Sequence, residues 1–327
     1  MATAGAPGNR DATGRLWVVS PVFLDVDAYL VLRARLLQIL SAHVPELPPA
    51  RFVVIDDSGG LDEEMARLRT FEDVTILTPP FNVGHQRALV FGLRSLGARM
   101  ADADWVVTLD ADGEDRPEDL PRLLAPLLEH TDDTRKVVLA WRTRRRESWT
   151  FKVMYFFFKI LFRTLTGALI QTGNYAAYRG WLVRHVLLHP HFDLCYSSSF
   201  LSLNLRVVYV PCERGARYAG ESRMSYVKLI MHGVRMMMPF LDRVAIRALV
   251  TFGVLGAVTV AVAGLLALAR IWHPGTAPGW SLYALFLLLI ALALFAGNFV
   301  ILFAIFAQSQ GSSLRGLRTR GEAGGDD

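Results

Sequence analysis

The sequence predicts an α/β protein with a mostly parallel sheet, followed by two helices that span a membrane. Short apolar runs alternate with helical patterns from residue 15 to about 145, as in chains that build parallel sheets covered by helices on both faces. Residues 248–269 and 281–307 contain no charged side chain, and each stretch exceeds the ~20 residues that cross a hydrocarbon core. The alternative, a pair of buried core helices, is disfavoured because both stretches are too long and too uniformly apolar.

The alternating part contains predicted strands and helices in turn. The strands are apolar runs with the length of buried strands: LWVVSPV (16–22), RFVVIDD (51–57), VTILTPP (74–80), DWVVTLD (104–110) and KVVLAWR (136–142). The helices have apolar residues at helical spacing, with Gly or Pro near the start of two of them: 28–40, 84–96 and 116–128. Residues 1–14 lack the apolar core of a signal peptide, and we expect a disordered leader there.

Two segments before the first span have the pattern of amphipathic helices that lie in a membrane interface. In the segment at about 150–170, Phe and Leu surround one narrow basic face made by Lys152, Lys159 and Arg163. A core helix with one hydrated edge is the alternative interpretation. The juxtamembrane segment 224–247 repeats the pattern with Lys228, His232 and Arg235. We expect Pro239 to bend or break this helix, and we interpret His232 as an interfacial polar residue rather than a metal ligand.

Charge patterning predicts the orientation of the chain in the membrane. The turn between the two spans carries no Lys or Arg, whereas basic residues flank the spans on their other sides: Arg243, Arg247, Arg315, Arg318 and Arg320. By the positive-inside rule, the folded domain and both termini face the cytoplasm. The predicted organisation is a domain at 15–223, spans at 248–270 and 281–307, and a tail at 308–327.

Net charge and cysteine usage agree with a cytosol-facing membrane protein. The formal net charge of +5 suits contact with anionic lipid headgroups. Nucleic acid is a disfavoured partner, because the basic residues concentrate near the apolar segments. Cys195 and Cys212 have no metal-site spacing, and we expect reduced thiols.

Acidic residues follow two of the predicted strands, at the edge where ligands bind in such sheets. Asp56 and Asp57 end one strand, and Asp110 and Asp112 follow another. No G-x-G-x-x-G follows the first strand, which argues against a dinucleotide oxidoreductase. Carboxylates two residues apart at a strand end, with Glu114 two further on, suit Mg²⁺ or Mn²⁺ together with a diphosphate. We expect the next three acids to be N-terminal helix acids stabilised by the helix dipole: Asp115, Glu118 and Asp119.

Five motifs together resemble one family, from about Leu16 to the C-terminus: VVSPV, VIDDSGG, NVGHQRALVFGL, DADGEDRPEDLPRLL and ERGARYAGESRMS. Followed by two apolar spans, they resemble the family 2 inverting glycosyltransferases of GT-A fold. Within that family they are similar to the polyprenyl-phosphate glycosyltransferases, such as dolichyl-phosphate mannose synthases and bactoprenol glucosyltransferases.

The resemblance implies roles for particular residues. The metal and diphosphate ligands would be Asp110, Asp112 and Glu114, binding Mg²⁺ or Mn²⁺; the catalytic residues would be Asp110, Asp112 and Arg217. The residues that contact the donor would be Pro21, Asp25, Asp56, Asp57, Asn82, Gly84, Arg142 with one of Arg144 to Arg146, Arg214, Ser222 and Arg223. The chain departs from the family pattern at Leu24-Asp25 for Asn-Glu, at a displaced Asp62, at Glu114 for Gln and at Arg223 for Lys.

The implied function is transfer of a sugar from a nucleotide-sugar, with UDP-glucose as the first expectation, to a polyprenyl phosphate. The enzyme would sit in a bacterial inner membrane and act on its cytoplasmic face. Relatives that use alcohol acceptors supply an acid near HFDLCYSSSFLSLNL, where this chain offers only Asp193. A lipid phosphate is already ionised and needs no general base, so this absence favours a phosphate acceptor.

Other functions remain open from the sequence. UDP-N-acetylhexosamines and GDP-mannose are alternative donors, and another lipid or a polysaccharide is an alternative acceptor. A processive polysaccharide synthase would need more spans and a Q-x-x-R-W segment, which WRTRRRESW does not provide. A non-catalytic membrane scaffold that keeps the fold is a rival of a different class. The sequence is also compatible with a homo-oligomer.

Overall fold

The computed structural model describes residues 14–129, 133–142, 149–169, 172–203, 205–218, 226–272 and 279–310. The predicted leader up to residue 13 and the tail from residue 311 lie outside these ranges. The chain forms two compact units, and each is described by itself. The first comprises 1–153, 170–239 and 312–327, and the second comprises 154–169 and 240–311.

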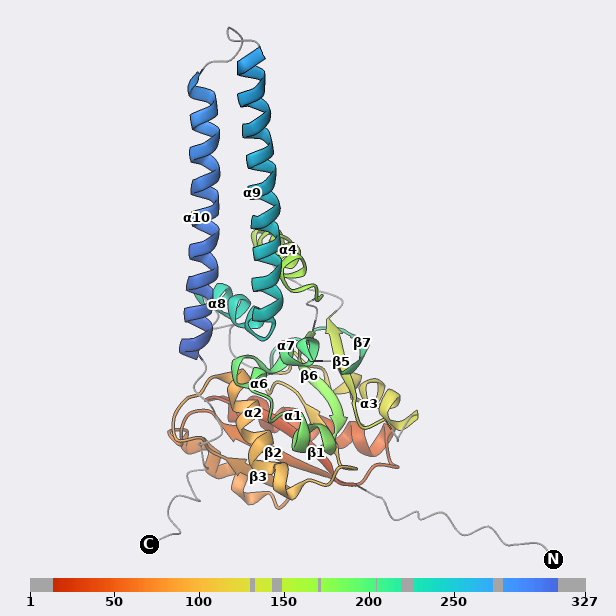
Figure 1. Ribbon diagram of the computed structural model, residues 1–327. Helices are drawn as coiled ribbons and strands as arrows, with labels where there is room; N and C mark the ends of the chain where they lie inside the picture. The colour runs from red at the N-terminus through yellow and green to blue at the C-terminus, as the bar shows by residue number, and fades with distance from the viewer. Residues whose placement is uncertain are drawn as a thin grey trace, which may run out of the picture. The chain divides into compact units, whose positions relative to one another are not determined.

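The first unit is built on a seven-stranded sheet with the order β3-β2-β1-β4-β6-β5-β7 (Figure 1). Its strands are β1 (Leu16–Val22), β2 (Ala50–Asp56), β3 (Val74–Leu77), β4 (Trp105–Thr108), β5 (Lys136–Arg142), β6 (Thr172–Arg179) and β7 (Arg206–Cys212). Only β6 runs antiparallel to its neighbours, so the sheet is mostly parallel, as predicted. The sequence prediction did not include β6 and β7.

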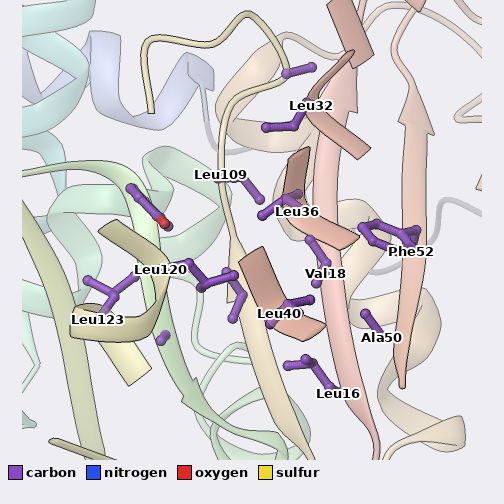
Figure 2. Close-up of a cluster of buried hydrophobic side chains, with 14 of the residues drawn as sticks. Leu16, Val18, Leu32, Leu36, Leu40, Ala50, Phe52, Leu109, Leu120 and Leu123 are labelled. Atoms are coloured by element: carbon purple, nitrogen blue, oxygen red, sulfur yellow. The ribbon is translucent and has the colours of Figure 1, made fainter. Parts of the chain in front are cut away.

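Helices cover both faces of the sheet. One face packs on α1 (Val26–His43) and α3 (Leu120–Glu129), the latter preceded by a short 3₁₀ turn at Pro117–Asp119. Figure 2 shows this core, in which Leu, Val and Phe side chains from the sheet and both helices meet: Leu16, Val18, Leu32, Leu36, Phe52, Leu120 and Leu123. Each fully buried Leu or Phe contributes roughly 1.5–3 kcal/mol of transfer free energy.

The opposite face packs on α2 (His85–Leu96) and on three short helices, α5 (Gly180–His185), α6 (His191–Leu194) and α7 (Tyr196–Ser202). Alternation along β1 explains the division between the two faces. Leu16 and Val18 belong to the first core, whereas Trp17 and Val19 belong to the second. The last helix described in this unit is α8 (Tyr226–Met237), which stops just before Pro239, as predicted from the proline.

The second unit contains most of α4 (Trp149–Thr166) and two long helices, α9 (Leu241–Trp272) and α10 (Gly279–Gln310), which pack along each other (Figure 1). Within this unit, the Phe162 ring of α4 meets the Phe240 ring edge-on with centroids 5.6 Å apart. Arg247 donates a 2.9 Å hydrogen bond to the carbonyl of Thr164, close to the C-terminal end of α4.

The two long helices expose apolar side chains, including Leu287 at 68% and Phe295 at 80% exposure. Among the described residues, one helix is long and apolar enough to cross a membrane, at Ile230–Val262, and a shorter apolar helix runs over Phe286–Ile301. The predicted domain boundaries, including the two separate spans, stay predictions. Contiguous exposed apolar side chains of this kind mark surfaces that contact another protein or a membrane.

Candidate active site

The sheet register brings the predicted acidic residues to one edge. β1 runs parallel to β2 with Val22 opposite Asp56, and parallel to β4 with Val19 opposite Thr108. The carboxyl ends of these three strands therefore meet at the same edge, where Asp57 follows β2 directly and Asp110 follows β4 after one residue. β5 and β7 also end there, with Arg142 opposite Cys212. The topology thus assembles acids and arginines that are distant in the sequence.

Asp56, the last residue of β2, and Asp57, the next residue, are buried and bound by backbone and hydroxyl donors. Asp56 accepts hydrogen bonds from the amide and hydroxyl of Ser58, at 3.0 and 2.5 Å. Asp57 accepts from the amides of Val83 and Gly84, at 2.9 and 3.3 Å. Burial raises the pKa of Asp57, while these two amides oppose that shift. The pair fixes the loop that leads into α2.

Asn82 and Gly84 belong to that loop. The side-chain amide of Asn82 donates a 2.9 Å hydrogen bond to the carbonyl of Asp57. Gly84 precedes α2 with a φ of 86°, a conformation that residues with a Cβ rarely adopt. The helix consequently begins at His85, beside the acidic strand end after β4.

Asp110 is held by two side chains that the sequence analysis did not assign to the site. Its Oδ1 pairs with Nε2 of His85 at 2.7 Å and accepts a 3.0 Å hydrogen bond from the amide of Asn174. The antiparallel register of β4 and β6, with Thr108 opposite Ala176, explains why Asn174 reaches this position. Partial burial opposes a charge on His85, but Asp110 and then Asp112 outweigh it and raise the His85 pKa to about 9.

Asp112 and Glu114 face a pair of arginines from the segment after β7. Arg217 contacts Oδ2 of Asp112 at 2.8 Å and Oε1 of Glu114 at 3.0 Å. Arg214 contacts Oε2 of Glu114 through two of its nitrogens, at 3.0 and 2.5 Å. Burial, and then the charges of Asp110 and Glu114, raise the pKa of Asp112. Burial also opposes the charge on Glu114, but hydrogen bonds from Arg214 and Arg217 lower its pKa.

The expectation that Asp115 begins a helix is wrong. Asp115 is 3% exposed, accepts a 3.0 Å hydrogen bond from the amide of Asp110 and pairs with Arg142 at 2.9 Å. Burial raises its pKa to about 6 although Arg142 opposes that shift. Local sequence could not indicate this, because Arg142 comes from the end of β5. Glu118 and Asp119 do lie in the 3₁₀ turn that leads into α3, as expected.

The end of β1 places Pro21 and Asp25 at the same edge. Pro21 is buried, and Asp25 precedes α1 within electrostatic range of Arg217. Leu24 has a φ of 53°, the left-handed conformation in which Asn is enriched among non-glycine residues. The departure from Asn at this position therefore puts a branched apolar residue in a strained backbone conformation.

A hydrogen-bonded chain connects Asp110 to the start of α7. Gln86 donates to the carbonyl oxygen of the Asn174 side chain and accepts a 3.0 Å hydrogen bond from the amide of Ser197. The hydroxyl of Thr108 donates a 2.6 Å hydrogen bond to the backbone carbonyl of Asn174. The signal for Gln86 was present in the Gly-His-Gln stretch, which the sequence analysis used only as a resemblance. Asn174 had no such signal, because β6 was not predicted.

Asp193, the single acid of the segment over α6 and α7, is buried against Arg94 as an ion pair. Arg94 also donates a 2.9 Å hydrogen bond to the carbonyl of Leu187. A carboxylate engaged with a buried guanidinium is a poor general base. Asp193 therefore has a structural partner that is sufficient to explain its presence.

Three of the predicted donor contacts lie outside the described residues: Ser222, Arg223 and the run Arg144 to Arg146. In the described part of the chain, no group of three or more His, Cys, Asp and Glu side chains is arranged to hold a metal ion. Asp110 and Asp112 nonetheless offer hard oxygen ligands, and one or two carboxylates plus substrate phosphates are the usual set for Mg²⁺. Glu114 differs from them, because both of its oxygens already bind arginines.

Known proteins resemble this chain along most of its length. The family model described as "Glycosyl transferase family 2" matches residues 18–187. An undecaprenyl-phosphate 4-deoxy-4-formamido-L-arabinose transferase of Enterobacter sp. (strain 638) is 24% identical over 95% of this chain and 92% of its own length. The protein of the same description from Edwardsiella ictaluri (strain 93-146) is 28% identical over 86% of this chain and 83% of its own. A crystal structure of a mycobacterial protein aligns with a TM-score of 0.48 and 18% identity, over 74% of this chain and 80% of that one.

Proposed function

This chain belongs to glycosyl transferase family 2, and we propose that it moves a sugar from a nucleotide-sugar to the phosphate of a polyprenyl lipid. The acceptor class is taken from the undecaprenyl-phosphate transferases that it resembles over most of its length. The alternation of strands and helices, the strand-end acids and the apolar C-terminal helices all agree with that reaction.

The observation that carries the proposal is the grouping of three arginines with three acids at one sheet edge. Arg142, Arg214 and Arg217 come from the ends of β5 and β7, and they meet Asp112, Glu114 and Asp115. A sugar nucleotide and a lipid phosphate bring several negative charges to one place. Guanidinium groups bind phosphate oxygens in a bidentate manner and keep their charge at all physiological pH values.

In the proposed reaction, the acceptor phosphate attacks the anomeric carbon from the face opposite the leaving nucleoside diphosphate. The bond from that carbon to the diphosphate oxygen breaks, and the configuration inverts. Arg214 and Arg217 stabilise the negative charge that grows on the diphosphate. Asp56 and Asp57, which backbone donors hold in place, contact the nucleoside.

The acceptor phosphate needs no general base, because it is ionised at neutral pH. This agrees with the ion pair between Asp193 and Arg94, which occupies the acid of the α6–α7 segment. An alcohol acceptor would need a carboxylate able to take its proton. The geometry around Asp193 therefore supports a phosphate acceptor over an alcohol.

Metal dependence is part of the proposal. Asp110 and Asp112 would hold Mg²⁺ or Mn²⁺, which would offset charge on the diphosphate. The pairing of Asp110 Oδ1 with His85 and Asn174 orients this carboxylate. Hydrogen bonds of that kind to a ligating carboxylate keep it in position before the metal arrives.

We further propose an integral membrane location, with two spans and the sheet domain on the cytoplasmic side. The apolar side chains exposed on α9 and α10 support burial in lipid. The half of α4 with exposed Phe156, Phe157 and Ile160 next to Lys159 supports a helix in the interface. Such an arrangement would keep the domain beside the phosphate headgroup of its acceptor.

A transfer assay with the purified full chain in detergent tests the function. Radiolabelled UDP-glucose, UDP-N-acetylglucosamine, GDP-mannose and a nucleotide-linked 4-deoxy-4-formamido-L-arabinose are each offered with undecaprenyl phosphate. Undecaprenol, which lacks the phosphate, is the matched control acceptor. We expect one donor to label undecaprenyl phosphate and none to label undecaprenol. Equal labelling of both lipids, or of a free sugar alcohol, would contradict a phosphate acceptor.

A further inference from the structure

Glu114 receives the two arginines that the proposed function assigns to the donor's diphosphate. Arg214 binds one carboxylate oxygen through Nε and a terminal nitrogen, and Arg217 binds the other oxygen through Nε. The Glu114 side chain is only 12% exposed, so these bonds form largely out of water. A carboxylate held by two guanidinium groups reproduces the charge and the acceptor pattern of a phosphate.

Backbone hydrogen bonds hold the segments 112–115 and 214–218 together without a contribution from the Glu114 side chain. The amide of Gly215 donates a 2.9 Å hydrogen bond to the carbonyl of Glu114, and the amide of Tyr218 donates one of 2.9 Å to the carbonyl of Asp112. Gly113 has a φ of 89°, and a Cβ there would come within 2.8 Å of the Tyr218 ring. The segments 112–115 and 214–218 therefore stay paired when the charge of Glu114 is removed.

The ionised Glu114 side chain lies near the carboxylate of Asp112, and the repulsion between the two charges costs electrostatic free energy. It raises the pKa of Asp112, and the ion-pair partners of Glu114 among the described residues are Arg214 and Arg217. Where the resemblance leads one to expect a neutral Gln, this chain has a carboxylate. The extra negative charge is paired with Arg214 and Arg217, and the charge of Arg142 also interacts with it.

We propose that Glu114 is an internal counter-ion that holds Arg214 and Arg217 in the position of the diphosphate and is displaced from them when the donor binds. Glu114 is then a positioning residue, not a metal ligand. This inference rests on the proposed function, since it takes the two arginines as diphosphate-binding groups. Because one anion replaces the other, the arginines stay ordered between turnovers. The exchange also lowers the affinity for the nucleoside diphosphate product.

Binding of inorganic pyrophosphate, UDP and GDP to the purified full chain tests the exchange. Calorimetry is run for the wild type and for Glu114→Gln, once in EDTA and once with Mn²⁺. Because Gln keeps the shape but not the charge, Glu114→Gln should bind pyrophosphate and one of the nucleotides on the order of tenfold more tightly. The gain should appear in EDTA as well as with Mn²⁺, because it comes from the arginines.

Glu213→Gln is the matched control, since Glu213 is exposed and pairs with Arg116 outside the site. It removes the same charge one residue away from Arg214 and should leave affinity unchanged. A gain of equal size in Glu213→Gln would show a general field effect and would overturn the proposal. In a background of Arg217→Gln, the gain from Glu114→Gln should shrink, because one of the two exchanged bonds is already absent.

Two further results would overturn the inference. Unchanged affinity of Glu114→Gln in EDTA, combined with weaker binding in Mn²⁺, would identify Glu114 as a metal ligand. A fall in the midpoint of thermal unfolding by more than a few degrees, without tighter binding in Glu114→Gln or in Glu114→Ala, would give Glu114 a purely structural role. Failure of the proposed function looks different, because the wild type would then bind no nucleoside diphosphate and transfer no sugar.

Discussion

Two acidic strand ends lie at the same edge of the sheet and are stabilised in different ways. After β2, Asp56 and Asp57 accept hydrogen bonds from backbone amides and from one serine. After β4, Asp110, Asp112 and Glu114 are paired with side-chain cations, namely His85, Arg214 and Arg217. The two groups share a residue type and a location, but not the kind of partner.

The difference separates acids that shape a site from acids that exchange partners in it. A backbone amide cannot leave its acceptor without a change in the loop, so Asp57 fixes the turn before α2. A side-chain cation can rotate away and bind an incoming phosphate instead. We therefore expect substitutions after β4 to reduce transfer, and substitutions after β2 to reduce stability and donor affinity.

The largest effect on transfer is expected for Asp112→Ala. Loss of this carboxylate should lower the rate by about 10³-fold or more, as when a charge-stabilising group is removed from other active sites. The unfolding midpoint should stay within a few degrees of the wild type, because burial and the neighbouring carboxylates already disfavour the charged form of Asp112. Addition of EDTA to the wild type should have a similar effect. Full activity in EDTA would contradict the proposed metal dependence.

The next largest effect is expected for Asn174→Leu, which removes the amide that orients Asp110. We expect transfer to fall by about 10- to 100-fold, the usual loss when a residue that orients a metal ligand is removed. The readout is the Mn²⁺ concentration at half-maximal rate, which should rise along with the loss of kcat. Gln86→Leu should show the same pattern more weakly. Loss of activity with unchanged Mn²⁺ dependence would mean that Asn174 only supports the fold.

A smaller effect on the rate is expected for Asp57→Ala, where the change falls on stability. The amides of Val83 and Gly84 would lose their acceptor, which costs about 1–3 kcal/mol of unfolding free energy. The donor KM should rise while kcat stays within a few-fold of the wild type. Asp57→Asn is the milder control, because it keeps an oxygen acceptor. A large loss of kcat in both variants would contradict the proposed difference between the two strand ends.

The smallest effect on transfer is expected for Asp193→Asn. The variant weakens a buried ion pair with Arg94, so the unfolding midpoint should fall. The rate with undecaprenyl phosphate should remain within about threefold, because a phosphate acceptor needs no base. A loss of about 10²- to 10⁴-fold, the size of a general-base contribution, would instead assign Asp193 to catalysis.

Much of the sheet was predictable because its buried strands carry local patterns. LWVVSPV and KVVLAWR coincide with β1 and β5, since a strand covered on both faces is largely apolar along its buried length. β6 escaped prediction because TGNYAAYR mixes polar and small residues, among them Asn174, which binds Asp110. The start of α2 was predictable from Gly84, whose positive φ is a local property of the chain.

The sequence by itself determined the residue types of the site and the strand-end location of most of them. Local patterns placed acids at the ends of β2 and β4 and Arg142 at the end of β5, and parallel strands gather their carboxyl ends at one edge. The strand-end position of Arg214 and Arg217 became apparent only with β7. Only the tertiary structure decided which charge meets which. It paired Asp115 with Arg142, Glu114 with Arg214 and Arg217, and Asp110 with His85 and Asn174. Charges interact through space, so partners 25 to 103 positions apart leave no mark in a local pattern.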